Sequence, residues 1–183
     1  IILTITIGIF LIFGFYLYKI YQNNQKELLS NKYNTAIINY YNTDKTKAVI
    51  SMKEIVKDRD ATYSPLALYF LIDNNLLINQ TEVNELFDIL INNTSLELEI
   101  KNLIIYKKGL FNADLSNENE LLDILKPLIN SKSIWEGHAL YLLAEYFFSK
   151  NEKQKSKEFF VKIIELENSN QQIKKKAQKR LNR

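Results

Sequence analysis

The stretch that decides the fold is residues 137–170, GHALYLLAEYFFSKNEKQKSKEFFVKIIELENSN. Apolar side chains recur three and four residues apart on both sides of a polar turn at residues 149–151. This spacing predicts two amphipathic helices that pack against each other. Large, small and aromatic residues alternate in a fixed order along them: Leu140, Leu143, Ala144, Phe147, Ser156, Phe160 and Ile163. Because Ala144 and Ser156 are small, we expect the two helices to cross closely there.

The rest of the chain repeats this arrangement with a period near 34 residues. Equivalent points of successive units are Tyr33, Ala67, Lys101 and Gly137. Such a period is typical of tetratricopeptide repeats, in which each unit is a pair of antiparallel helices. Helical stripes support the upstream units: Tyr33, Ile37, Tyr40 and Tyr41; Ala48, Met52, Ile55 and Val56; Val83, Leu86, Phe87 and Leu90; Leu121, Leu122, Leu125 and Leu128.

The sequence therefore predicts an all-α fold with two parts. Residues 1–21 form a transmembrane anchor, and residues 22–183 form a tetratricopeptide-like right-handed superhelix of about four helical hairpins. A capping helix over 171–183 ends the array, with Ile173, Ala177 and Leu181 facing inward. Pro127 should stop or kink its helix. Helix starts are predicted at four pairs: Ser64 before Pro65, Thr94 with Glu97, Asn117 with Glu120, and Ser133 with Glu136.

The N-terminal segment is predicted to span or anchor in a membrane. Residues 1–18, IILTITIGIFLIFGFYLY, carry no charge. As a helix they would extend about 27 Å, close to the hydrocarbon core of about 30 Å. Apolar anchor residues are Ile1, Ile9, Phe13 and Leu17. An aromatic and basic interface belt follows, made of Tyr16, Tyr18, Lys19 and Tyr21.

A cleaved signal peptide is the less favoured interpretation of this segment, because no small-x-small cleavage site follows it. The chain begins with Ile1 and not with Met, so we expect residues to precede it. Without that flank, the lysines after the span do not determine which side of the membrane the C-terminal part occupies.

Composition limits the chemistry. The chain has 0 Cys and 1 His, which excludes thiol catalysis, thiolate metal sites and His-rich metal sites. His138 is interpreted as a structural or surface residue, because no nucleophile elbow accompanies it. No Gly-rich phosphate loop is present, since Gly109 and Gly137 are isolated. We therefore expect no enzymatic activity, no cofactor, no metal, no small-molecule substrate and no nucleic-acid partner.

Aromatic and basic residues are the candidates for contacts with partners. Tyrosines on the predicted first helices are candidates for the concave face: Tyr33, Tyr40, Tyr69, Tyr106 and Tyr141. Ordinary packing between repeats is the alternative for at least half of them. Trp135 is interpreted as an apolar plug between the third and fourth hairpins. The basic residues of the last helix are interpreted as a solvated face, with acidic-lipid binding as the alternative: Lys174, Lys175, Lys176, Lys179, Arg180 and Arg183.

Residues 121–164, LLDILKPLINSKSIWEGHALYLLAEYFFSKNEKQKSKEFFVKII, also carry a family resemblance. The matching positions are Leu125, Pro127, Leu128, Trp135, Ala139, Leu142, Leu143, Ala144, Phe159 and Phe160. With the N-terminal anchor, they resemble the ancillary SecYEG translocon subunit family of Gram-negative bacteria, whose tetratricopeptide-like domain is shared with cell-division coordinator proteins.

This resemblance implies an inner-membrane protein with a single anchor and a periplasmic repeat domain. It also implies protein partners, namely the translocon, a chaperone or client polypeptides. The alternative left open by the residues is a cytoplasm-facing membrane scaffold whose basic C-terminus contacts lipid.

Overall fold

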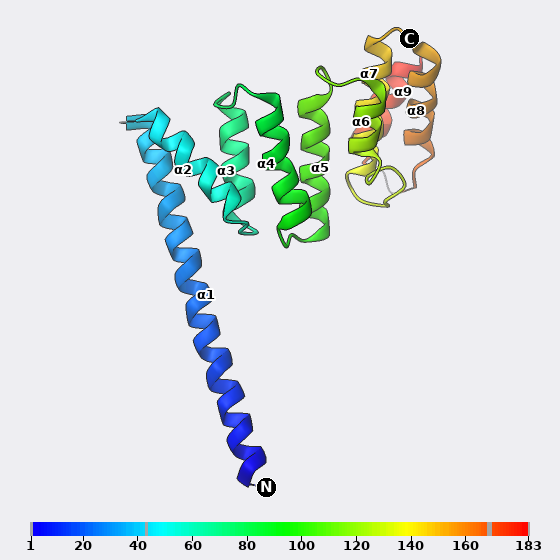
Figure 1. Ribbon diagram of the computed structural model, residues 1–183. Coiled ribbons are helices and arrows are strands. Elements are labelled where there is room, and N and C mark those ends of the chain that lie inside the picture. The colour runs from blue at the N-terminus through cyan, green and yellow to red at the C-terminus, as the bar shows by residue number, and fades with distance from the viewer. Residues whose placement is uncertain (1, 43, 168–169, 183) are drawn as a thin grey trace. The chain divides into compact units, whose positions relative to one another are not determined.

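The computed structural model describes residues 2–42, 44–167 and 170–182, with side chains from Phe10 onward. Within these residues every regular element is an α-helix, which confirms the all-α prediction. Figure 1 shows the helices in chain order: α1 (Ile2–Asn42), α2 (Lys45–Lys57), α3 (Tyr63–Asp73), α4 (Gln80–Asn93), α5 (Leu98–Asn112), α6 (Glu118–Leu125), α7 (Glu136–Ser149), α8 (Lys153–Glu165) and α9 (Gln171–Leu181).

The chain divides into two compact units, residues 1–78 and residues 79–183. The first unit contains α1 to α3, and the second contains α4 to α9. The predicted boundary between anchor and repeat domain, after residue 21, falls inside α1, which continues through it without a break. The end of the proposed membrane contact near residue 21 therefore stays a prediction.

The predicted repeat period agrees with the order of the helices. Tyr33, Ala67, Lys101 and Gly137 lie in α1, α3, α5 and α7, so each equivalent point falls on an odd-numbered helix. The predicted second hairpin would pair α3 with α4, and these helices belong to different units.

In the first unit, α2 packs against the C-terminal half of α1 and against α3. The predicted stripe of α2 is fully buried: Ala48, Met52, Ile55 and Val56. Lys32 of α1 lies 3.3 Å from carboxylate oxygens of both Glu54 and Asp58, which joins the two helices at the surface. Tyr41 was predicted to face inward and is instead exposed, because Ala36 marks the buried face of this stretch and a residue five positions later lies on another face of α1.

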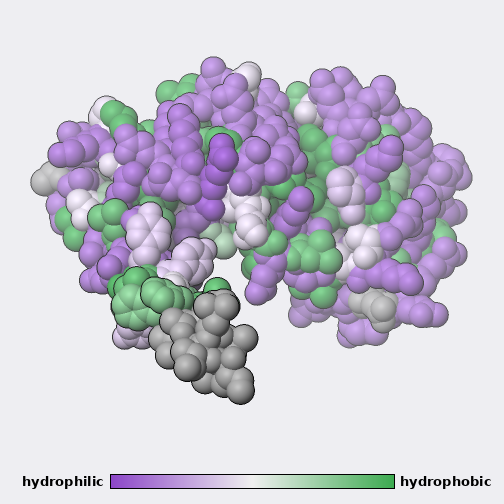
Figure 2. Space-filling model, turned by 60° about the horizontal axis from the view of Figure 1, so that its bottom comes forward, coloured by the Kyte–Doolittle hydropathy of each residue, from purple (hydrophilic) through white to green (hydrophobic). Residues whose placement is uncertain are grey.

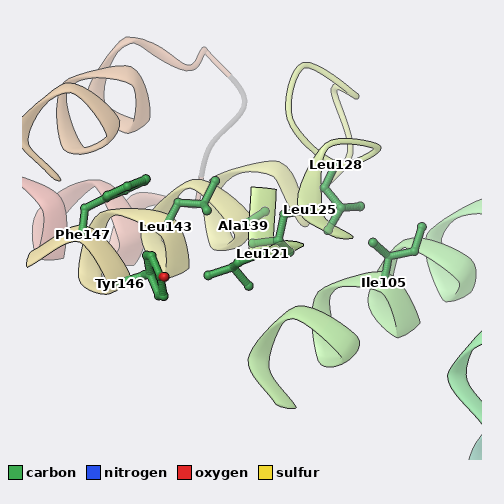
Figure 3. Packing of buried hydrophobic residues seen from close by; sticks show 8 residues of the cluster. All are labelled: Ile105, Leu121, Leu125, Leu128, Ala139, Leu143, Tyr146 and Phe147. Atoms are coloured by element: carbon green, nitrogen blue, oxygen red, sulfur yellow. The ribbon is translucent and has the colours of Figure 1, made fainter. Parts of the chain in front are cut away.

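In the second unit, consecutive helices pack against each other, and α7 also contacts both α5 and α9. Figure 3 shows the core where α5, α6 and α7 meet, with apolar side chains of all three helices converging. Its members are Ile105, Leu121, Leu125, Leu128, Ala139, Leu143, Tyr146 and Phe147. A second cluster joins α7, α8 and α9, so α7 is buried on two sides.

Two predicted helix ends are confirmed. Asn117 and Glu120 form a reciprocal capping box: the Asn117 side chain accepts from the Glu120 N–H, and the Glu120 carboxylate accepts from the Asn117 N–H. Helix α6 ends at Leu125, two residues before Pro127, as expected from the missing N–H of proline.

Two other predicted starts are wrong. Helix α3 begins at Tyr63, and Ser64 lies inside it with a buried hydroxyl that donates to the Ile55 carbonyl at 2.6 Å. The Asp60 carboxylate, not Ser64, accepts from the first backbone N–H groups of this turn. Thr94 is the C-cap of α4, where its hydroxyl donates to the Ile89 carbonyl.

The predicted pair Ser133 and Glu136 also differs from a capping box. The Ser133 hydroxyl accepts from the Trp135 N–H, while the buried Glu136 carboxylate accepts from the N–H groups of Asn130 and Lys132 at 2.8 and 3.0 Å. Asn130 and Lys132 have positive φ angles of 68° and 57°. Glu136 therefore holds the loop between α6 and α7 in a tight turn, because a buried charge needs hydrogen-bond donors and these two N–H groups provide them.

Candidate protein-binding surface

The hairpin of α7 and α8 forms the base of the candidate surface. All seven residues of its sequence pattern are buried: Leu140, Leu143, Ala144, Phe147, Ser156, Phe160 and Ile163. The Ser156 hydroxyl donates to the Ala144 carbonyl at 2.8 Å, so the two helices are in direct contact at the small residues. Because these seven side chains are buried, they determine how the two helices pack. Contacts with a partner would come from exposed residues around them.

Helix α9 covers the end of this hairpin as predicted. Ile173 and Ala177 are buried and Leu181 is half-buried, and all three pack on the cluster formed by α7 and α8. The inward stripe of the capping helix is therefore confirmed. Arg183 and residues 168–169 lie outside the described residues.

Arg180 of α9 forms an ion pair with Glu145 of α7. Its Nε donates to Glu145 Oε1 at 2.8 Å and its Nη2 to Glu145 Oε2 at 2.5 Å. Its guanidinium carbon also lies 5.0 Å from the centre of the Phe148 ring. Arg180 thus fastens α9 to α7, an interaction that the sequence analysis missed. The partners are 35 residues apart, so no local spacing indicates the pair.

Several lysines near Arg180 are exposed. Lys153 and Lys157 lie one turn apart on α8, and Lys176 and Lys179 lie on α9. Among the described residues, none of these four makes an ion pair. We call these four lysines the basic surface. Lys155 is different, since it is paired with Glu118 and Glu152, and their hydrogen bonds raise its pKa to about 12.

A hollow of about 280 Å³ opens between the ends of α7, α8 and α9. Its apolar lining comes from Phe148, Phe160 and Leu181. Lys153, Lys157 and Arg180 line it as well, together with Ser156. Phe148 is 45% exposed, so part of its ring faces solvent beside the core. An exposed ring next to unpaired cations is the clearest surface feature of the second unit.

The predicted tyrosines lie in both units. In the first unit, Tyr33 contacts the Tyr63 ring, with ring centres 5.9 Å apart, and Tyr40 contacts Phe70 at 5.1 Å. Tyr69 is largely buried, and burial together with the nearby Asp73 raises its pKa. Three of the five candidates are thus engaged in packing within the first unit.

The other two tyrosines lie in the second unit. Tyr106 stacks on Trp135, with ring centres 5.6 Å apart, and His138 completes the group at 5.7 Å from Tyr106 and 5.2 Å from Trp135. Trp135 therefore sits between α5 and α7, where a plug between the third and fourth hairpins was predicted. Tyr141 packs edge-on against Phe160 at 5.6 Å. Burial raises the pKa of both Tyr106 and Tyr141.

His138 lies among a backbone carbonyl and two aromatic rings. Its Nδ1 lies 3.3 Å from the Ile134 carbonyl oxygen, and its ring faces Tyr106 and Trp135. Among the described residues, no three or more His, Asp or Glu side chains gather in a way that could hold a metal ion.

A polar groove of about 440 Å³ runs over α4, α5 and α6. At its base the amides of Asn84 and Asn112 exchange two hydrogen bonds, of 3.0 and 2.8 Å. Gln80 adds a third bond to Asn112. Asn112 is buried and satisfied, so this network fixes α4 against α5.

The described part of the predicted anchor is apolar and exposed. Figure 2 shows its green and white side chains against a mostly purple surface. Phe13 and Leu17 of the anchor are exposed, as are Tyr16, Tyr18 and Tyr21 of the belt. Ile1 and Ile9 lie outside the residues whose side chains are described. Within the described residues, no helix combines the length and apolar character that crossing a bilayer requires.

Comparisons with protein-family models, with curated proteins and with solved structures found no match for this chain. No family assignment follows, and the resemblance to the translocon subunit family stays a prediction.

Proposed function

We propose that this chain is a membrane-anchored protein-interaction module. The observation that carries the proposal is the surface of α7, α8 and α9, where exposed Phe148 lies among unpaired lysines. Exposed aromatic rings in shallow hollows contribute strongly to protein–protein binding, since they bury a large area at little entropic cost. We assign no reaction to the chain, and no cofactor or small-molecule substrate.

The binding domain is proposed to be a tetratricopeptide-like right-handed superhelix of about four hairpins with a cap. Packing within the second unit supports this: α7 contacts its sequence neighbours and also α5 and α9. Contacts between every second helix are expected when hairpins stack in one direction. The buried crossing of Ala144 and Ser156 supports it further.

The anchor is proposed to be residues 1–21, lying in a bilayer. Exposed apolar side chains between Phe10 and Tyr21 support this, because contact with lipid would remove them from water. Tyr16, Tyr18, Lys19 and Tyr21 would lie at the headgroup level.

The partner and compartment are proposed from the sequence resemblance alone. They are the Sec translocon, with its chaperones or clients, on the periplasmic side of a bacterial inner membrane. The alternative is a cytoplasmic scaffold whose C-terminus contacts lipid. It is favoured by the exposed, unpaired lysines of α9, since anionic headgroups attract such residues at about 1 kcal/mol each.

Site-specific photo-crosslinking tests the protein-binding role. A benzophenone amino acid placed at Phe148 should form adducts with polypeptides in membranes that contain the full chain. Leu110 is a matched control, because it is 46% exposed, against 45% for Phe148. Adducts with lipid alone at Phe148, or equal polypeptide adducts at both positions, would argue against the module.

Alkaline carbonate extraction tests the anchor. The full chain should remain with the membrane pellet, and a chain beginning at residue 22 should be released. Release of the full chain would show that residues 1–21 do not anchor it.

A further inference from the structure

The hollow between α7, α8 and α9 combines three apolar side chains with cations and, among the described residues, no acidic lining residue. Phe148, Phe160 and Leu181 provide the apolar area, and Lys153, Lys157 and Arg180 provide the charge. Glu145, the nearest carboxylate partner of Arg180, is already held in two hydrogen bonds.

The charge at this hollow is available to a partner. Lys153 and Lys157 have no carboxylate partner among the described residues. They lie in the first turns of α8, whose N-terminal end carries a partial positive charge. Each lysine would therefore gain a new attraction from an anionic side chain without losing an existing pair.

The dimensions favour a single side chain as the occupant. The hollow holds about 280 Å³. Sites for drug-sized ligands typically measure about 300–1,000 Å³ and enclose most of the ligand. This hollow lies at the lower end of that range, so it has room for one apolar side chain presented by a longer partner.

The spacing of the lysines suggests the neighbours of that residue. Lys153 and Lys157 are four residues apart, which is about 6 Å along a helix. Residues i and i+2 of an extended peptide are about 6.6 Å apart. In that conformation the side chain between them faces the opposite way. A peptide that puts an apolar residue into the hollow must therefore turn at that residue to bring both flanking carboxylates over the two lysines.

Building on the protein-binding role proposed above, we propose that this hollow binds an acidic polypeptide segment through one aromatic or aliphatic side chain flanked by carboxylates. The apolar side chain enters against Phe148 and Phe160. Its acidic neighbours lie over Lys153 and Lys157, while Arg180 keeps α9 in place as one wall. Lys176 and Lys179 extend the positive potential beyond the hollow on the other side of Arg180.

Fluorescence anisotropy with defined peptides tests this assignment on the full chain in phosphatidylcholine nanodiscs. The probe is the dye-labelled peptide GSDFDSG, with GSDSDSG and GSNFNSG as controls that lack the ring or the charges. We expect the probe to bind about tenfold more tightly than either control. Equal binding of all three peptides would overturn the proposal.

Substitutions of the lining residues test whether the peptide binds in the hollow. Phe148→Ala, and the pair Lys153→Gln with Lys157→Gln, should each weaken binding of GSDFDSG about tenfold. Lys174→Gln with Lys175→Gln is the matched control for charge, since these lysines do not line the hollow, and should leave binding unchanged. Circular dichroism verifies that each variant is folded; Phe148 and both lysines are exposed, so the fold should persist.

A lipid competitor separates the two anionic partners. Short-chain phosphatidylglycerol should displace the peptide no better than short-chain phosphatidylcholine does. Selective displacement by phosphatidylglycerol, with GSDFDSG bound no better than GSDSDSG, would replace the peptide site by a lipid site. Peptide binding that is unaffected by all the hollow variants would refute this site but leave the protein-binding module intact.

Discussion

The Ser156 hydroxyl donates a 2.8 Å hydrogen bond to the backbone carbonyl of Ala144, and both residues are buried. A side chain of α8 thus reaches the backbone of α7 directly, which requires a small residue on each helix. The expectation that these residues face each other is confirmed. This crossing fixes the angle of the hairpin on which α9 and the candidate surface are built.

Enlarging one of the two residues should therefore destabilise the hairpin. Ala144→Leu should lower the free energy of unfolding by about 1–3 kcal/mol, because the added side chain has no space between the helices. Urea denaturation followed by circular dichroism measures the change. Gln154→Leu, at an exposed position of α8, is the control and should alter stability by about 0.5 kcal/mol or less. Equal midpoints for Ala144→Leu and the parent chain would contradict the observed packing.

Gly109 provides a second test of core packing. A Cβ atom there would overlap with Leu125 Cδ2, and Leu125 is completely buried. Gly109→Ala should therefore destabilise the chain, although alanine favours a helix by about 1 kcal/mol. In a Leu125→Ala background the same change should become stabilising, because the conflicting methyl group is gone. A double-mutant cycle measures this reversal, and additive effects would show that Leu125 moves aside freely.

The two faces of α9 should respond differently to substitution. Ile173→Asp with Leu181→Asp places charges in the apolar contact with α7 and α8, and should cost at least about 2 kcal/mol. Lys174→Gln, Lys175→Gln and Lys179→Gln should leave thermal unfolding unchanged, since the lysines lie outside that contact. Scanning calorimetry measures both variants. A folded, stable Asp variant would show that α9 is not needed as a cap.

Alkaline pH should destabilise the folded chain through four half-buried tyrosines. Burial raises the pKa of Tyr33, Tyr69, Tyr106 and Tyr141 above the ordinary value of about 10. The folded chain therefore holds these phenolic protons more tightly than the unfolded chain. Their stabilising contribution is complete below pH 10 and is lost as the pH rises through the folded pKa values.

Absorbance at 295 nm as a function of pH measures this effect. The native chain should show an early phase from exposed tyrosines and a late phase that accompanies unfolding. In concentrated urea all tyrosines should titrate together near pH 10. A single native phase near pH 10 would contradict the partial burial of these four rings.

Helices and their buried faces could be predicted because both depend on local spacing. The stripe of Ala48, Met52, Ile55 and Val56 is buried as the periodicity indicates. Asn117 and Glu120 cap α6 as their separation of three residues suggests. Proline has no backbone N–H and therefore interrupts a helix locally, and α6 accordingly ends before Pro127.

Features that depend on tertiary contacts could not be predicted. Serine is a common N-cap residue, which is why Ser64 was predicted to start a helix. Its hydroxyl instead donates a hydrogen bond to the Ile55 carbonyl of the preceding helix. The Glu136 carboxylate accepts hydrogen bonds from backbone N–H groups of the loop before α7, and does not cap the start of its own helix. Arg180 was expected to be solvated, yet Glu145 and Phe148, more than thirty residues away, hold it in place. The hollow beside it exists only because three helix ends meet.

The central proposal is that an N-terminal anchor holds the helical units on the periplasmic side of a membrane. The chain has 0 Cys, so a single introduced thiol reports its location without background from the protein. Gln154→Cys places that thiol at an exposed position on α8. In a Gram-negative host, we predict that a membrane-impermeant maleimide labels this Cys in intact cells and that the labelled chain pellets with the inner membrane. Labelling only after lysis, or recovery of the full chain in the soluble fraction, would contradict the proposal.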